Sequence, residues 1–581
     1  MKNKWMIYTK KANFLDIAKK NNISPIVAKV LVNRDIKDEA DIHLFLNGTI
    51  NDLRDYNLLN DIDKATKKIE EKIKNNKKIL IVGDYDIDGI SATYILYDSL
   101  KKLNANVYYK IPERIKDGYG INKRIIEEAI KENVDTIITC DNGISAIEEI
   151  KLANENNITV IVSDHHNVGG IANEAYCIVN PKKNDNKKLY PFDGICGASV
   201  ALKLICKLYH NMNLKDPFFN YLEFACLATI GDIMPMIDEN HIIAKEGLKK
   251  INEAIKEKNM GKVQINKGFY ELLNVQSLLE KEINETHMGY LIGPLVNASG
   301  RLKNAYVALN LFISQNDDEI KEYAKELKIL NDERKQLTED NTKKSIEEVE
   351  KNCKNDNVLV VYDNTFREEV IGIVAGRIKE KYYKPAIVIS NSDDENIVKG
   401  SARSIEEYDM FYNLSIENDL FIRFGGHKGA AGFSMYKKNI EKLKERLNKN
   451  CTLTKEDCTK KFWVDASFPL KFVNLSLMDD LEKLKPFGTD TTKFPSPLFG
   501  AKDLNYSIKG IYGIEKNVIK LSISDGETYL NAVYFGDTKE ISDSKSNKDT
   551  KINILFEPQI NEYMGKRSVE VVIKDYYFSQ K

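Results

Sequence analysis

The sequence predicts an α/β protein: a parallel-sheet domain, a long helix that joins it to a smaller α/β domain, and a C-terminal β-barrel. Short apolar runs alternate with helical segments between residues 61 and 166, which is typical of parallel strands joined by crossover helices. A second, shorter alternation of the same kind begins at residue 357. After about residue 455 the pattern changes to short strands separated by turn residues, as in a small all-β barrel.

The first predicted strand, Ile79–Val82, ends at Gly83 and is followed by three alternating aspartates, Asp84, Asp86 and Asp88. A short, β-branched, wholly apolar run is expected of a strand buried on both faces. Ligands bind at the carboxyl ends of such strands. Three neighbouring carboxylates repel one another unless a cation lies among them, and Mg²⁺ or Mn²⁺ suits oxygen ligands. Taken alone, the segment equally fits a solvated turn, since Asp and Gly are common turn residues.

Two further predicted strands also stop on an aspartate. The run 135–141 ends on Asp141, and the run 158–166 reaches Asp164, His165 and His166. Parallel strands present their carboxyl ends along one edge, so the acidic groups converge. Imidazole beside several carboxylates is typical of a first-row divalent metal site, which we favour over a histidine that only satisfies hydrogen bonds. The accompanying strand and helices are predicted at 107–111, 61–76, 123–133 and 145–156.

The middle of the chain supplies a fourth acidic candidate, Asp232, which follows an apolar helix predicted at 221–229. An aspartate in this place could also simply cap the next turn. Farther on, Asn297–Arg301 is predicted as a turn that carries a cation, and helices dominate residues 305–349. Heptad-like apolar positions are few in this segment, which predicts a bridging helix with solvated faces over a coiled coil.

The second α/β unit ends in two glycine-containing segments, 400–404 and 425–432. Glycines let the backbone approach a ligand, while Ser401, Arg403 and His427 supply donors for phosphate. The second segment alone would also fit a glycine-rich turn between strands. The unit's strands are predicted at 357–362 and 386–390, with a helix at 370–381.

The sequence pattern of the C-terminal part predicts five short β-strands that fit an OB-fold. This barrel commonly binds single-stranded nucleic acid by base stacking and by contacts of positive charge with the backbone. Another small barrel remains open at this point. The predicted strands cover residues 506–512, 518–523, 529–535, 552–556 and 569–573.

Bulk properties narrow the class of protein. The 581 residues are too many for one core and predict about three to five domains. The 86 basic and 87 acidic side chains nearly cancel, so the protein as a whole does not attract polyanions electrostatically. Any nucleic-acid site must therefore be a local patch of positive charge. The eight cysteines form no C-x-x-C pair, which favours reduced thiols in a cytoplasmic protein. We expect neither secretion nor membrane insertion, since no signal-like or long apolar run occurs.

Four segments together resemble the motifs of the DHH phosphoesterase superfamily: GDYDIDG (83–89), Asp141 in TCDNGIS, Asp164-His165-His166, and Asp232 in GDIMP. Its DHHA1 partner domain is similar to GSARS (400–404) and GGHKGAAG (425–432). One branch, the bacterial RecJ single-strand-specific 5′ to 3′ DNA exonucleases, resembles the chain further in IPERIKDGYG (111–120), NASGR (297–301), the N-terminal segment and the barrel tail. The resemblance covers nearly the whole chain.

The resemblance implies a role for each matched position. Two Mn²⁺ or Mg²⁺ ions would be held by Asp86, Asp88, Asp141, His165 and Asp232, with Asp141 as the bridge. Asp84 and Asp164 would be catalytic-site groups that bind metal or orient imidazole and water, and His166 would face the scissile phosphate. The nucleic-acid backbone or terminal phosphate would be held by Arg114, Asn297, Arg301, Ser401, Arg403, Gly426 and His427.

Three positions depart from the family pattern. Phe366-Arg367 stands where Trp-His is usual, and Pro294-Leu295 stands where Pro-Arg is usual. Residues 486–499 replace a compact Gly-Asn-Pro turn. These differences affect substrate binding more than catalysis, because every acidic residue expected to bind metal is present.

The function implied is a single-stranded-DNA-specific 5′ to 3′ exonuclease that releases 5′-mononucleotides in repair and recombination, assisted by a helicase and a single-strand-binding protein. The rivals are a DHH phosphodiesterase on short oligoribonucleotides or cyclic dinucleotides, a non-catalytic single-strand-binding scaffold, and a pyrophosphatase. The expected domains are an N-terminal helical segment (1–55), the DHH domain (56–300), connecting helices (301–352), the DHHA1 domain (353–452) and the OB-like domain (453–581).

Overall fold

The computed structural model describes residues 3–168, 174–183, 189–256, 264–489, 492–544, 550–563 and 565–580. The chain forms two compact units, each assembled from separated stretches. The large unit consists of Tyr56–Asp232 and Lys250–Lys460, and the small unit consists of Met1–Asp55, Ile233–Lys249 and Lys461–Lys581. The chain therefore enters and leaves each unit more than once.

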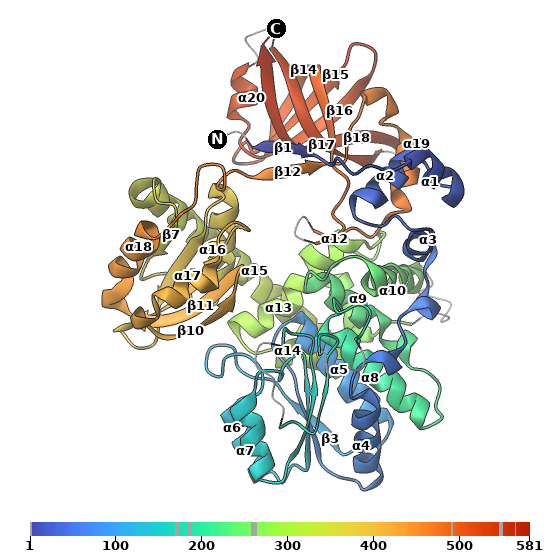
Figure 1. Cartoon of the computed structure of the whole chain (residues 1–581), viewed down its shortest axis with the longest axis vertical. Helices are drawn as coiled ribbons and strands as arrows, with labels where there is room; N and C mark the ends of the chain where they lie inside the picture. The colour runs from blue at the N-terminus through green and yellow to red at the C-terminus, as the bar shows by residue number, and fades with distance from the viewer. Residues whose placement is uncertain are drawn as a thin grey trace. The chain divides into compact units, whose positions relative to one another are not determined.

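A parallel five-stranded sheet organises the first part of the large unit (Figure 1). Strands β2 and β4 are buried at every residue, which explains their continuously apolar sequences. The strands predicted from the sequence are confirmed, and β6 is an additional one. In spatial order the strands are β3 (Val107–Lys110), β2 (Ile79–Val82), β4 (Thr136–Cys140), β5 (Thr159–Ser163) and β6 (Cys177–Val179).

Crossover helices cover both faces of this sheet. The buried side chains of α6 and α7 pack on Leu80 and Val82, which point to one face. Helices α4, α5 and α8 pack against one another on the other side (Figure 1). These helices are α4 (Ile62–Lys74), α5 (Ile87–Lys102), α6 (Lys123–Lys131), α7 (Ile147–Glu155) and α8 (Gly197–Asn211).

Helices continue the large unit beyond the sheet. The turn predicted at Asn297–Arg301 is wrong, because these residues lie inside α13. Asn, Ser and Gly favour turns by propensity, but tertiary packing overrides it here. A side chain at Gly300 would place its Cβ 2.4 Å from the carbonyl oxygen of Tyr85. The helices of this part are α9 (Leu222–Gly231), α11 (Lys267–Val275), α12 (Glu285–His287), α13 (Gly293–Leu302), α14 (Tyr306–Ile313) and the predicted bridging helix α15 (Asp317–Glu348). Helix α10 (Asp238–Lys256) belongs to the small unit up to Lys249 and to the large unit from Lys250.

A second, mixed sheet completes the large unit. The segment 400–403 ends β9, and the segment 425–432 forms a hairpin, with Gly425–His427 ending β10, a turn at Lys428-Gly429, and Ala430 starting β11. Alternate residues of β9 point to opposite faces, so Ser401 and Arg403 share a face while Val398 and Ala402 enter the core. In spatial order the strands are β10 (Phe421–His427), β11 (Ala430–Tyr436), β9 (Ile397–Arg403), β8 (Ala386–Asn391) and β7 (Leu359–Tyr362), flanked by α16 (Ile371–Tyr382), α17 (Met410–Ile416) and α18 (Ile440–Lys449).

The small unit contains a closed β-barrel, as predicted. The ring closes because β14 pairs with both β15 and β17. The N-terminal segment also contributes a strand, β1, which the sequence did not predict and which pairs with β12. The barrel comprises β14 (Phe499–Tyr512), β15 (Val518–Ser524), β16 (Tyr529–Phe535), β17 (Thr550–Tyr563) and β18 (Lys566–Gln580), and the unit adds β1 (Lys4–Ile7), β12 (Lys461–Val464), β13 (Ala466–Ser467), α1 (Phe14–Asn21), α2 (Pro25–Asn33), α3 (Glu39–Asn47), α19 (Leu475–Glu482) and α20 (Lys539–Asp543).

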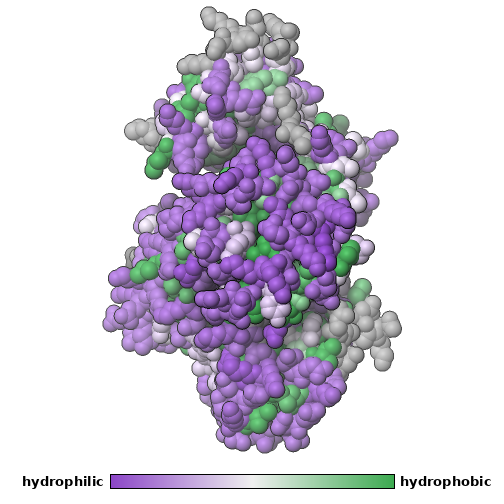
Figure 2. Space-filling view, turned by 90° about the vertical axis from the view of Figure 1, so that its left-hand side faces the viewer, coloured by the Kyte–Doolittle hydropathy of each residue, from purple (hydrophilic) through white to green (hydrophobic). Residues whose placement is uncertain are grey.

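The surface of the molecule is mainly polar. On the face drawn in Figure 2, hydrophilic residues cover most of the area and apolar residues appear in small, separate groups. Of the helices in the described ranges, none is both long enough and apolar enough to cross a bilayer.

Candidate metal centre and phosphate-binding site

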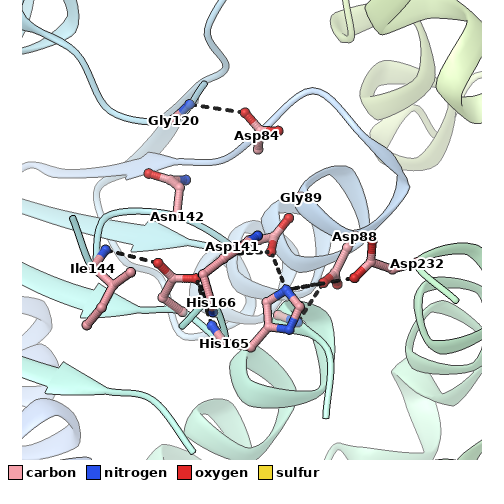
Figure 3. A network of polar contacts seen from close by, with 12 residues as sticks. Asp84, Asp88, Gly89, Gly120, Asp141, Asn142, Ile144, His165, His166 and Asp232 are labelled. Atoms are coloured by element: carbon pink, nitrogen blue, oxygen red, sulfur yellow. Dashed lines mark hydrogen bonds and ion pairs between the residues drawn. The ribbon is translucent and has the colours of Figure 1, made fainter. Parts of the chain in front are cut away.

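The carboxyl edge of the first sheet brings the predicted acidic residues together (Figure 3). Asp84 follows β2, Asp141 follows β4 and Asp164 follows β5, and these three strands are neighbours in parallel register. All three side chains are buried. The convergence predicted from the strand ends is therefore observed.

His165 lies at the centre of the acidic group. Its Nε2 atom is 3.1 Å from Asp141 Oδ1, 3.5 Å from Asp88 Oδ2 and 3.8 Å from Asp232 Oδ2. The described residues offer two overlapping sets of ligand atoms, each within 4.8 Å: Asp141, His165 and His166, and Asp88, His165 and Asp232. Two such sets side by side suit a pair of neighbouring cations.

The carboxylates of this centre are buried close to one another. Burial, followed by the charge of Asp86, raises the pKa of Asp88 to about 6. Burial and the nearby Asp88 also raise the pKa values of Asp141 and Asp232 well above the usual range. Within the described chain, Asp141 Oδ1 accepts no hydrogen bond. Buried carboxylates persist when they are paired or metal-bound, so this donor set fits hard divalent cations such as Mn²⁺ and Mg²⁺.

The two histidines are in different states. Burial lowers the pKa of His165 to about 3, so near neutral pH its ring is uncharged and can donate a lone pair to a metal. His166 is 44% exposed at its side chain, and its Nδ1 lies 2.8 Å from Asp164 Oδ1. Although burial opposes it, this contact raises the pKa of His166 and lowers that of Asp164. His166 is thus the more cationic and more accessible member of the pair.

Asp164 orients the histidine pair and lies outside both ligand sets of the described residues. Its carboxylate accepts the backbone N–H groups of His165 at 2.7 Å, His166 at 3.1 Å and Ile144 at 2.9 Å. A carboxylate held by this many donors fixes the backbone of the histidine pair. This arrangement fits the orienting role predicted for Asp164.

Two helix N-termini hold the next aspartates. Asp86 caps α5, and its Oδ1 accepts the N–H groups of Asp88 at 3.1 Å and Gly89 at 3.0 Å. Asp88 accepts the N–H groups of Gly197 at 2.6 Å and Ala198 at 2.7 Å, at the start of α8. Helix N-termini favour negative charge, so the N–H groups of Gly197 and Ala198 partly offset the effect of burial on the pKa of Asp88. Asp86 falls outside both ligand sets of the described residues, and its predicted role as a ligand stays a prediction.

Asp84 lies behind the centre and reaches a glycine turn. Its Oδ1 accepts the N–H group of Gly120 at 3.2 Å. Burial and the charge of Asp86 raise its pKa well above the usual range. Gly120 has a φ of +68°, and a Cβ there would lie 2.9 Å from the Cβ of Asn142, so the turn requires glycine. Asp84 thus connects the carboxyl edge of the first sheet to the segment that contains Arg114.

The same turn presents Tyr119, a residue that the sequence did not single out. Its hydroxyl donates to the carbonyl oxygen of Asp141 and lies 3.2 Å from His166 Nδ1. Asp141 itself has a φ of +61°, a conformation that is uncommon for a residue other than glycine and is typical of functional sites. The tyrosine hydroxyl therefore supports this conformation.

A cluster of arginines adjoins the acidic centre through Tyr85. Arg114 lies over the Tyr85 ring, with its Cζ 5.4 Å from the ring centroid. Burial and the nearby charges of Arg114, Arg334 and Arg403 lower the pKa of Arg301. No carboxylate of the described residues lies within ion-pair distance of any of these four arginines. These arginines are half-buried, and partly desolvated cations without carboxylate partners mark a site for an anion.

Two further arginines, Arg334 and Arg377, lie near the predicted phosphate-binding residues. Arg334 donates to Asn331 Oδ1 at 2.9 Å and 3.1 Å. Its pKa is lowered by burial and by the charge of Arg377. Arg334 lies on α15 and Arg377 lies on α16. In the sequence of a helix, an arginine that faces a binding site cannot be distinguished from one that faces solvent.

The other predicted phosphate-binding residues have varied surroundings. Arg403 donates to Ser401 Oγ at 3.3 Å on β9. Asn297 Oδ1 accepts the N–H of Ile87 at 2.8 Å and so holds the start of α5. His427 is exposed, and Gly426 has a φ of +153° with the carbonyl oxygen of Ala430 only 2.3 Å from where its Cβ would be. The direct contacts of Asn297 and Gly426 are therefore internal.

The positions that depart from the family pattern are occupied by structural residues. Phe366 and Leu295 are buried in the core. Arg367 forms an ion pair with Glu369 at 2.7 Å. Residues 490 and 491 of the segment 486–499 lie outside the described ranges.

Three family models match the chain in succession. The DHH family N-terminal domain matches residues 78–229, the DHHA1 domain matches 355–452, and the RecJ OB domain matches 464–575. The single-stranded-DNA-specific exonuclease RecJ of Bacillus subtilis (strain 168) is 33% identical over 558 residues, which cover 95% of this chain and 68% of the relative. The Escherichia coli (strain K12) RecJ is 26% identical over 573 residues and 95% of each chain.

Solved structures show the same fold. The crystal structure of RecJ in complex with Mn²⁺ from Thermus thermophilus aligns with a TM-score of 0.81 at 23% identity, covering 100% of this chain and 80% of that one. The Mg²⁺ complex of the same protein aligns with a TM-score of 0.75 at 22% identity, covering 100% and 78%. Given the three domain matches in order and a relative that is 33% identical along 95% of this chain, the chain belongs to the RecJ family of the DHH superfamily.

Proposed function

We propose that this chain is a single-stranded-DNA-specific 5′ to 3′ exonuclease that releases 5′-mononucleotides by phosphodiester hydrolysis with two Mn²⁺ or Mg²⁺ ions. The carrying observation is the pair of ligand sets around His165 beside an arginine cluster to which the described residues supply no carboxylate partner. The names of the relatives, single-stranded-DNA-specific exonucleases, support the substrate class.

The metal centre would use Asp88, Asp141, His165 and Asp232, with Asp86 as a further ligand and Asp141 as the bridge. When bound, the two ions lower the pKa of a water molecule and offset charge on the phosphoryl oxygens. The Tyr119 hydroxyl on the carbonyl of Asp141, and the N–H groups that hold Asp88, keep these ligands in place before substrate arrives. Such preorganisation avoids rearrangement during the reaction.

The residues around the centre would position the DNA. His166, half-exposed and held by Asp164, offers a cationic imidazole N–H to the scissile phosphate. Arg114, Arg301 and Arg403 place fixed positive charge where the phosphates of the 5′ end would lie, with the Ser401 hydroxyl as a further donor. Asp84, Asn297 and Gly426 shape the backbone around this site, and His427 extends it on the second sheet.

The cellular setting follows from the same proposal. An exonuclease of this class acts in DNA repair and recombination in the cytoplasm, with a helicase to unwind duplex and a single-strand-binding protein to deliver substrate. Our domain assignment is the five-part division given above. The DHH, DHHA1 and RecJ OB matches each fall within one of these parts.

One assay tests the function directly. Single-stranded DNA labelled at the 5′ or the 3′ end is incubated with the purified chain and Mn²⁺ or Mg²⁺, beside blunt duplex, a short oligoribonucleotide and a cyclic dinucleotide. We expect the 5′ label to leave at once as a mononucleotide while the 3′-labelled strand shortens stepwise. Equal cleavage of blunt duplex, or preferred cleavage of the dinucleotide, would refute the proposal, and binding without any cleavage would identify a scaffold.

A further inference from the structure

Both tryptophans of the chain lie on one small ribbon in the small unit. The sequence contains only Trp5 and Trp463, which lie on β1 and β12, paired in parallel (Figure 1). Lys4 pairs with Lys461, and Met6 pairs with Trp463. Side chains alternate along a strand, so these four residues share one face. The ribbon precedes the RecJ OB match, which begins at residue 464.

The opposite face of the ribbon anchors it to the barrel. Trp5 Nε1 donates to Asp575 Oδ2 at 2.6 Å, and the Trp5 ring centroid lies 4.6 Å from that of Tyr577 on β18. Val464 is buried against Leu498 and Leu555. The ribbon is therefore a rigid extension of the barrel.

The outer face of the ribbon combines exposed apolar surface with positive charge. Trp463 is 50% exposed and Met6 is 39% exposed. The ring of Tyr8 lies 5.1 Å from that of Trp463 at an interplanar angle of 31°. Lys4 and Lys461 occupy the next pair along the ribbon. Half-exposed tryptophan is typical of interaction surfaces, and the two lysines add positive charge to the same face.

We propose that this outer face, formed by Lys4, Met6, Tyr8, Lys461 and Trp463, is a docking platform for single-stranded nucleic acid. A base stacks on Trp463 beside Tyr8, and the backbone phosphate lies by the two lysines. Every base has a face that stacks on an aromatic ring, so such a platform binds single strands with little dependence on sequence. The inference rests on the proposed function for its ligand class, and it adds a contact outside the metal centre and the arginine cluster.

The two tryptophans provide their own reporter. In the full chain with Trp5→Phe, Trp463 is the only tryptophan, and in Trp463→Phe only Trp5 remains. Without divalent metal, so that no strand is cut, an oligothymidylate of about 20 nucleotides should quench and shift the emission of Trp463 and leave that of Trp5 nearly unchanged. A duplex of the same length should leave both unchanged. Unaltered Trp463 emission at saturating oligothymidylate, or equal quenching by duplex, overturns the proposal.

Matched variants test the contribution to affinity. Trp463→Ala should weaken oligothymidylate binding about 5- to 100-fold, whereas Trp463→Phe should retain most of it, since stacking is lost only in the first. Tyr412→Ala removes an aromatic side chain that is 62% exposed on α17 of the large unit, and it should bind as the parent does. Lys461→Gln should reduce the salt dependence of log K by about 0.7, the contribution of one phosphate contact on a single strand.

The outcomes separate this proposal from the proposed function. If Trp463→Ala binds as tightly as the parent while its circular dichroism is unchanged, the platform is refuted, whatever the cleavage assay shows. If Trp463 is quenched as expected but the chain with metal cuts no DNA, the platform stands and the exonuclease assignment fails.

Discussion

Asp141 has the most demanding position of any single residue in the centre. It lies among other carboxylates, its φ is in the left-handed region, and its Oδ1 accepts no hydrogen bond from the described residues. Such a residue costs stability in the metal-free protein, because repulsion and strain act together. The cost is offset when cations bind. Function and stability therefore oppose each other at this position.

We expect Asp141→Asn to lower hydrolysis of single-stranded DNA more than about 100-fold, since even groups that orient metal ligands are worth 10- to 100-fold. The metal-free variant should melt a few degrees higher than the parent, because a repelled buried charge is gone. Binding of single strands without metal should persist. Thermal unfolding, Mn²⁺ titration and end-labelled cleavage measure the three effects. Asp332→Asn, at an exposed site on α15, is the control, and full turnover in Asp141→Asn would contradict the assignment.

Asp88 makes metal binding depend on pH. Its pKa is about 6 in the folded, metal-free chain against about 3.9 when unfolded. Between these values the folded state keeps a proton that the unfolded state has released, so the stability of the metal-free protein falls as pH rises from about 4 to 6. Mn²⁺ needs the carboxylate ionised, so its affinity should rise at least tenfold per pH unit below pH 6, and more steeply where Asp141 and Asp232, whose pKa values are also raised, lose their protons. Calorimetry in two buffers of different ionisation enthalpy should show that Mn²⁺ binding releases protons at pH 5.5, and affinity without pH dependence would contradict this.

At the scale of elements, the sequence predicted what is local and missed what is brought together by folding. Each buried strand and the aspartate after it could be inferred, because an apolar run and its polar end are adjacent in the chain. The N–H groups of Gly197 and Ala198 that hold Asp88 come from a helix 109 and 110 residues away. No local pattern marks them. Similarly, Asn297–Arg301 has turn-like residues but is helical because it packs under Tyr85.

Helix α8 gives a test at this scale. A Cβ on Gly197 would lie 2.7 Å from the Cβ of Asp141, so Gly197→Ala should displace that aspartate. We expect weaker Mn²⁺ binding and at least about a tenfold loss of hydrolysis. The helix itself should remain folded, because alanine favours helix over glycine by about 1 kcal/mol. Gly376→Ala on α16, where a Cβ meets nothing within 4 Å, is the control and should be neutral or stabilising. Parental Mn²⁺ affinity in Gly197→Ala would show that the close approach is harmless.

At the scale of the whole molecule, segments that are far apart in the sequence belong to the same compact unit. The small unit joins residues near the N-terminus to the barrel at the other end of the chain. Arg34 of the N-terminal segment forms a buried ion pair with Asp465, and both side chains are nearly inaccessible, at 3% and 0%. Removing the tail near residue 455 would therefore leave Asn33 and Arg34 without Asp465, to which both donate hydrogen bonds. Hydropathy and motifs could not predict this pairing, since 431 residues separate the two side chains.

Because this ion pair lies within the small unit, we predict that the small unit and the large unit unfold in two separate thermal transitions. Arg34→Met leaves Asp465 buried without its cation, which typically costs about 3–5 kcal/mol, so the transition of the small unit should fall by roughly 10 °C. Saturating Mn²⁺ binds the large unit and should raise only the other transition, by mass action on its folded state. Arg34→Met with Asp465→Leu should recover much of the loss, because an apolar pair can replace a buried ion pair. Differential scanning calorimetry of the parent and both variants, each with and without Mn²⁺, resolves these shifts. A single transition that responds equally to Mn²⁺ and to Arg34→Met would mean that the two units unfold as one.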